Sequence, residues 1–87
     1  MNHDIKPSLL KILQKLSKKD KKRYKATLNK INEIINCENP NHYKNLRHDM
    51  KQYKRVHIDS YVLIFKIEKD NIIFTDLQHH DVIYRRK

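Results

Sequence analysis

The chain contains no glycine among its 87 residues, and this absence limits the nucleotide chemistry open to it. Phosphate-binding loops of the P-loop and dinucleotide-binding kinds need glycine, because only a residue without a side chain lets the backbone approach the phosphates so closely. We therefore expect no nucleotide cofactor. The single cysteine, Cys37, has no partner for an internal disulfide, which is typical of a protein of the reducing cytoplasm.

Long apolar segments are also missing. No run approaches the ~20 apolar residues of a membrane span. Lysines interrupt the apolar residues near the N-terminus and no small-residue cleavage site follows, so a secretory signal is not expected either. We expect one cytoplasmic domain, residues 1–87, without membrane association. A domain of this size buries only about 60–65% of its chain surface, which favours a site in a surface groove.

Positive charge is abundant. The 20 Lys and Arg residues exceed the 10 Asp and Glu residues and give a formal net charge of +10. Such a charge attracts nucleic acid, an anionic membrane or an acidic protein. Most of the excess lies in residues 1–36, where lysines crowd the predicted outer faces of two helices. These lysines are either a solvated surface or a track for a phosphate backbone or an acidic partner.

Hydrophobic spacing predicts two helices in the first part of the chain. The apolar residues of 8–17 fall on one helical face, and Pro7 suits the first turn of that helix. Residues 17–20 resemble a capping box, which predicts a second helix from there to about Asn36. The apolar stripe of this helix consists of Tyr24, Leu28, Ile31 and Ile35.

Three strands are expected after an ordered polar segment, at residues 53–58, 61–67 and 72–77, and residues 2–6 carry a weak signal for an edge strand. The order of elements predicts an α+β domain, in which a two-helix hairpin packs on one face of a small antiparallel β-sheet. The middle strand is apolar on both faces, as expected for a central strand.

Alternation in the first of these strands separates two faces. Val56 and Ile58 point one way, whereas Arg55 and His57 point the other. On an open sheet face, Arg55 and His57 would place a fixed cation beside a titratable base. They are otherwise solvated residues on the outer side of a half-buried sheet.

The last nine residues combine two imidazoles, a phenol and three fixed positive charges. His79 and His80 are consecutive, so in extended backbone only one of them points into a groove. Tyr84 can donate or accept a proton, and the arginines after it can grip a phosphate. The same tail could be packing and solvated charge. No spacing of His and Asp here matches a known metal-binding pattern, so no metal ion is expected.

In the order of these features the chain resembles the RelE/ParE superfamily of type II toxin–antitoxin modules, in its RelE-type mRNA interferase branch. The likeness lies in the lysine-rich turn between the helices, in residues 53–62, in the strand at 72–77 and in the closing segment 79–84. Residues 53–62 are similar to the family pattern Tyr-x-Arg-Val-Arg-Val-Gly-Asp-Tyr-Arg. The closing segment is similar to the terminal pattern His-Arg-x-x-x-Tyr.

The resemblance implies a RelE-like fold and a metal-independent endoribonuclease that cleaves mRNA on the ribosome by attack of the ribose 2′-hydroxyl, without a cofactor, and so inhibits translation. The implied partners are mRNA, the ribosome and a cognate acidic antitoxin similar to RelB, which would form a hetero-oligomer with the toxin. The candidate catalytic residues are His79, His80, Tyr84, His57 and Arg55. The candidate RNA-binding residues are Lys54, Arg85, Arg86, Lys18, Lys19, Lys22 and Arg23.

Two positions depart from the family pattern. Val62 stands where RelE-type enzymes carry an arginine that holds the scissile phosphate, and Asp59 replaces the turn glycine. Two other functions therefore stay open. One is a ParE-like inhibitor of DNA gyrase, which needs no acid–base residues. The other is a non-catalytic RNA- or protein-binding module derived from a toxin, which the loss of the arginine favours.

Overall fold

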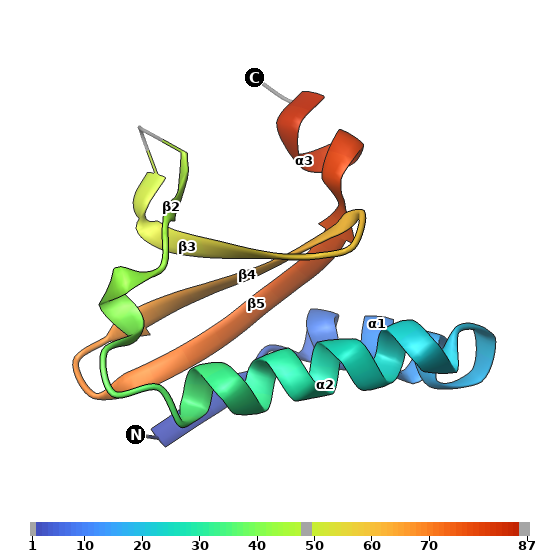
Figure 1. Cartoon of the computed structure of the whole chain (residues 1–87), viewed down its shortest axis with the longest axis horizontal. Helices are drawn as coiled ribbons and strands as arrows, with labels where there is room; N and C mark the ends of the chain where they lie inside the picture. Colours follow the sequence, from blue (N-terminus) through green and yellow to red (C-terminus); the bar gives the residue numbers. More distant parts are fainter. Residues whose placement is uncertain (1, 48–49, 86–87) are drawn as a thin grey trace.

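A β-sheet with two long helices on one face and a short C-terminal helix on the other forms the protein (Figure 1). The computed structural model describes residues 2–47 and 50–85. The elements are β1 Asn2–Ile5, α1 Pro7–Lys19, α2 Lys21–Ile35, the 3-10 helix η1 Pro40–His42, β2 Asn45–Arg47, β3 Met50–Ile58, β4 Tyr61–Glu68, β5 Asn71–His79 and α3 His80–Arg85. The predicted α+β class, with a helix hairpin on one sheet face, is confirmed.

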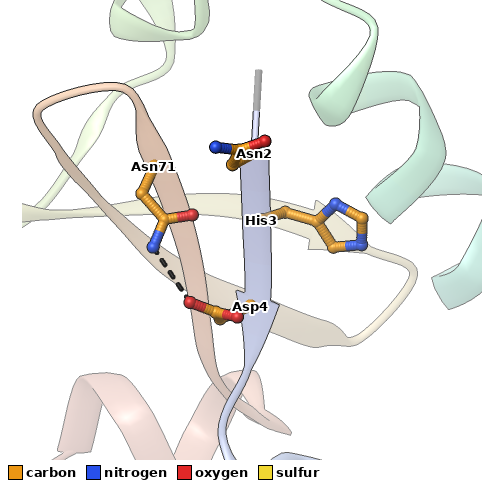
Figure 2. Close-up of a pocket in the computed structure, with 4 residues that line it drawn as sticks. All are labelled: Asn2, His3, Asp4 and Asn71. Atoms are coloured by element: carbon orange, nitrogen blue, oxygen red, sulfur yellow. Dashed lines mark hydrogen bonds between the residues drawn. The ribbon is translucent and has the colours of Figure 1, made fainter.

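The described strands follow the spatial order β1-β5-β4-β3-β2. Strands β2 to β5 pair antiparallel, whereas β1 pairs parallel with β5. β1 confirms the weak edge-strand signal near the N-terminus. Its Asp4 carboxylate accepts a hydrogen bond of 2.9 Å from the Asn71 side-chain amide of β5, while His3 points to the other side of the strand (Figure 2).

The main core lies between the hairpin and the sheet. Its buried members are Leu9, Leu13, Ile31, Ile34, Ile58, Leu63, Phe65, Ile72, Phe74 and Leu77. Burying a side chain of this size contributes ~1.5–3 kcal/mol, so this layer is the main source of stability. No helix among the described residues is long and apolar enough to cross a membrane.

The helix boundary differs from the predicted capping box. α1 continues through Lys19, and the Ser17 hydroxyl donates within α1 to the Gln14 carbonyl at 2.7 Å. The N-cap of α2 is Asp20, whose carboxylate accepts from the Arg23 backbone N–H at 3.1 Å and also pairs with the Arg23 guanidinium. The box prediction was therefore wrong by three residues, because aspartate caps a helix as well as serine does.

The buried stripe of α2 is also rotated from the predicted one. Thr27, Ile31 and Ile34 are buried, whereas Leu28 is 38% exposed. Thr27 can be buried because its hydroxyl donates to the Arg23 carbonyl at 2.8 Å. Thr27, with its hydroxyl hydrogen-bonded, thus occupies the buried position that the hydrophobic pattern predicted for Leu28.

A register shift in the β4–β5 pair lies between Ile64 and Phe65. Because side chains alternate along a strand, one extra residue exchanges the two faces beyond it. Phe74 before the shift and Leu77 after it both face the helix hairpin as a result. In the same way, His79 follows Leu77 on the hairpin side and Gln78 lies on the opposite side.

The turns between the strands use left-handed backbone without glycine. Asp59 in the β3–β4 turn and Lys69 in the β4–β5 turn both have φ of 55°. A side chain at positive φ crowds the following carbonyl, which is why glycine is usual at such positions.

We expect Asp20→Ala to lower the free energy of unfolding by about 1 kcal/mol, because it removes the α2 cap. Urea denaturation would measure the change. Glu38→Ala, at an exposed position outside the helices, is the matched control. An equal loss in both variants would show that Asp20 does not stabilise α2.

Candidate functional site

A second, smaller apolar cluster lies on the sheet face opposite the hairpin. It joins Val62 and Ile64 of β4 to Ile83 of α3, and Tyr53 packs against it. Val62 is fully buried, and Ile83 is 9% exposed. This cluster seats α3 on the sheet and so places the first residue of that helix, His80, over β3.

His80 and His57 come together on this face. Their ring centroids are 5.6 Å apart, with the planes at 39°. Arg55 is two residues before His57 on β3, so both residues share this face, as their alternation predicted. The His80 backbone N–H donates to the Ser60 carbonyl at 2.7 Å, which ties the start of α3 to the β3–β4 turn. Two imidazoles and a guanidinium thus meet at a surface open to a substrate.

The environment changes the proton affinity of one imidazole. Partial burial lowers the pKa of His57 below its ordinary value of 6.5, and the charges of Arg55 and His80 lower it further. His57 is therefore neutral at pH 7 and can accept a proton. Asp81 lies beside His80, with 3.6 Å between its carboxylate and the His80 Nδ1, and can orient that ring.

His79 lies on the other face, with Tyr61. The two ring centroids are 5.5 Å apart in an edge-on arrangement, and the Arg23 guanidinium carbon lies 4.3 Å from the centroid of Tyr61. The His79 Nδ1 accepts from the Asp81 backbone N–H at 3.1 Å. His79 therefore holds the junction of β5 and α3, and His80 is the imidazole that reaches the candidate site.

The remaining candidate residues fall into three groups. Tyr84 and Arg85 are the last two residues of α3, where the structure describes the backbone only, and Arg86 lies outside the described residues. Lys54 donates to the Tyr43 carbonyl at 3.2 Å and to the Asn45 side chain at 3.1 Å. The helix cations lie on the hairpin side of the sheet, away from the His57–His80 pair: Lys18, Lys19 and Lys22 are exposed, and Arg23 is paired with Asp20.

Two polar residues on the site face were not selected from the sequence. Asp76 lies opposite Ile64 in the β4–β5 register, and its carboxylate accepts from the Gln78 amide at 2.6 Å and from the Leu77 backbone N–H at 2.9 Å. Strict alternation from Ile72 would assign Asp76 and Gln78 to the core side of the sheet. The register shift places them on the opposite face, so the sequence pattern does not predict their position. Among the described residues, no three His, Cys, Asp or Glu side chains are grouped so as to hold a metal ion.

Comparison with known proteins identifies the family. The model described as ParE toxin of type II toxin-antitoxin system, parDE, matches residues 4–84. A protein of Methanocaldococcus jannaschii named "Putative toxin RelE4" is 58% identical over 87 residues, which cover 97% of this chain and 90% of the relative. A protein of Methanosarcina mazei named only "Uncharacterized protein" is 43% identical over 83 residues, covering 92% of this chain and 94% of the relative.

A small toxin domain is thus the class to which this fold and sequence correspond. The chain belongs to the RelE/ParE toxin superfamily and is the toxin of a type II toxin–antitoxin module, which implies a cognate antitoxin as its partner. The resemblance found in the sequence is confirmed at this level.

The fold also accounts for the valine at position 62. Because Val62 is buried beneath α3, an arginine there would have to lie under the helix or displace it.

We expect Val62→Arg to destabilise the protein by several kcal/mol, since it buries an unpaired charge (~3–5 kcal/mol for uncompensated cases). Thermal denaturation measures this. Val82→Arg, the same change at a 39% exposed position of α3, should leave the melting temperature nearly unchanged; a similar loss there would refute the packing argument.

A second prediction concerns protonation. NMR titration of the His57 ring should give a midpoint below 6.5, and Arg55→Gln should raise it because a neighbouring positive charge is removed. The unfolded chain binds more protons than the folded chain between the two pKa values, so the free energy of unfolding should fall as the pH drops through that interval. Arg23→Gln, on the other face, is the control and should leave the His57 midpoint in place. A midpoint at or above 6.5 in the unaltered protein would contradict the burial argument.

Proposed function

We propose that this toxin is a metal-independent endoribonuclease that cleaves mRNA on the ribosome and so inhibits translation. The observation that supports it most is the His57–His80 pair, 5.6 Å apart on a sheet face that also carries Arg55. RNA contains its own nucleophile, the ribose 2′-hydroxyl. An enzyme needs to add a base, an acid and positive charge at the phosphate, and these three residues provide one of each.

In the proposed reaction, His57 removes the proton from the 2′-hydroxyl, and the resulting oxyanion attacks the adjacent phosphorus. The bond from phosphorus to the 5′-oxygen breaks, and His80 in its protonated form gives a proton to that oxygen. The products are a 2′,3′-cyclic phosphate and a free 5′-hydroxyl. The lowered pKa of His57 suits the base, since the ring is neutral before the reaction. Arg55 balances the charge that grows on the phosphate oxygens.

Tyr84 and the terminal arginines belong to the same proposal. Tyr84 follows His80 by four residues in α3, and positions four apart share one helix face. We assign Tyr84 to the site as a second proton donor, and Arg85 and Arg86 to the RNA backbone. His79 contributes by holding α3 in place through Tyr61.

Charge suggests how the partners meet. The net charge of +10 favours both a ribosome-bound RNA and an acidic, RelB-like antitoxin, with which the toxin would form a hetero-oligomer. Lys18, Lys19 and Lys22 lie on the hairpin side, so they would hold ribosomal RNA while the opposite face holds mRNA. A cytoplasmic location follows from these partners.

The test is a translating extract in which mRNA ends are mapped after addition of the toxin. We expect codon-positioned cuts, and we expect His57→Ala and His80→Ala to slow cutting ~10²–10⁴-fold, the usual contribution of acid–base catalysis. Tyr84→Phe should also slow cutting. His3→Ala is the matched control, because His3 is exposed on β1, at the sheet edge farthest from β2.

The other outcomes would assign a different function. Intact mRNA together with inhibited supercoiling by DNA gyrase would favour a ParE-like toxin, a reading supported by the ParE family match. Intact mRNA and unaffected gyrase would favour a non-catalytic binding module.

A further inference from the structure

A groove of about 470 Å³ lies at the edge of β3 and is lined by His42, Tyr43, Lys44, Arg55, Val56 and His57. The last pair of the β2–β3 ladder joins Lys54 to Asn45, the first residue of β2, so the groove opens where β3 continues beyond the start of β2. It shares Arg55 and His57 with the candidate catalytic site. His42, Tyr43 and Lys44 take no part in the mechanism above, which leaves the other end of the groove without an assigned role.

We propose that this groove binds one nucleotide of the RNA next to the scissile phosphate, with its base against His42 and its phosphate between Lys44 and Arg55. The inference rests on the proposed ribonuclease function and adds a subsite that would set nucleotide preference beside the cut.

An aromatic platform carries the first part of the argument. The rings of His42 and Tyr43 stack, with centroids 4.3 Å apart and planes at 29°. Tyr43 in turn meets the buried Phe65 edge-on at 5.7 Å, so the stack is supported from the main core. His42 is exposed. Bases bind to such flat aromatic surfaces in single-stranded RNA, because every base has a π face.

The platform is also held rigidly. Pro40 is buried at the start of η1, and the Tyr43 backbone N–H donates to its carbonyl at 3.3 Å. The His42 Nδ1 lies 2.6 Å from the Asn39 carbonyl, and since a carbonyl only accepts, this nitrogen carries the proton and fixes the ring. The Lys54 ammonium also donates to the Tyr43 carbonyl at 3.2 Å. A subsite formed in advance costs little ordering entropy when the ligand binds.

The charges around the groove favour a phosphate. Lys44 is exposed, and the Arg55 guanidinium is directed by a 3.1 Å hydrogen bond from its Nε to the Asn45 carbonyl. The Arg55 backbone N–H also donates to the Lys44 carbonyl at 3.0 Å, which keeps the two cations adjacent. Among the described residues, those that line the groove include no carboxylate. A nucleotide can contact both the two cations, through its phosphate, and the stacked rings, through its base. An acidic peptide would contact the cations alone, so the groove fits a nucleotide better.

The test compares steady-state cleavage of short, ribosome-bound mRNAs that differ at the nucleotides flanking the cut. We expect His42→Ala to raise KM about tenfold, the lower part of the range for loss of one stacked base, and to reduce discrimination at one flanking nucleotide while kcat stays constant. Lys44→Ala should raise KM without changing that discrimination. His42→Phe keeps a ring for stacking and should restore the preference, although it loses the hydrogen bond to Asn39.

Two control variants remove the same side chains at the opposite side of the sheet, His3→Ala and Lys6→Ala, and both should leave KM unchanged. Unchanged KM and preference in His42→Ala, or a loss confined to kcat, would overturn the subsite. A weaker antitoxin complex with unaltered RNA kinetics would also overturn it and assign the groove to the protein partner.

Binding to an RNA with a 2′-deoxy nucleotide at the cut separates this inference from the proposed function, because that RNA can bind but cannot react. If the unaltered toxin cuts no ribosome-bound mRNA, the ribonuclease proposal fails. Weaker binding of the deoxy-substituted RNA by His42→Ala would still support the groove, and equal binding would refute it.

Discussion

β4 carries apolar side chains on both of its faces, and each face needs a cover. Leu63 and Phe65 are covered by the helix hairpin, and Val62 and Ile64 are covered by α3. The two long amphipathic helices of the hairpin cover the first face and form the main core with it. Within residues 2–47 and 50–85, the helix that covers the opposite face is the six-residue α3, which begins with His80. The same apolar contact that protects the sheet therefore brings the second imidazole to His57.

The sequence predicts the large elements well because their signals are local. Helical spacing marked both long helices, and strict alternation in β3 correctly placed Arg55 and His57 on the face away from the hairpin. The missed features depend on contacts distant in sequence. β2 is three residues long, too short for an alternating pattern to mark it as a strand, and it pairs with β3.

His79 and His80 show most clearly what the sequence alone cannot predict about the site. Their consecutive positions indicate that one faces the site but not which one, since the answer depends on the register shift between β4 and β5. The terminal motif of the family favoured His79, whereas the geometry places His80 beside His57. Val62 also has a different meaning in the fold than in the sequence. As a departure from the family pattern it indicates a lost phosphate contact, whereas in the structure its buried side chain packs beneath α3. The proposed reaction would therefore depend more on proton transfer by His57 and His80 and less on fixed positive charge.

The lack of glycine also affects the unfolded chain. Asp59 and Lys69 adopt left-handed backbone at a steric cost of order 1 kcal/mol each, which glycine would avoid. Every residue of this chain is, however, more restricted when unfolded than glycine would be, and such restriction is worth ~0.4–1 kcal/mol at a position compatible with it. The two strained turns are thus offset by a smaller loss of conformational entropy on folding. This chain therefore folds from a denatured ensemble with fewer conformational states than a glycine-containing chain of the same length would have.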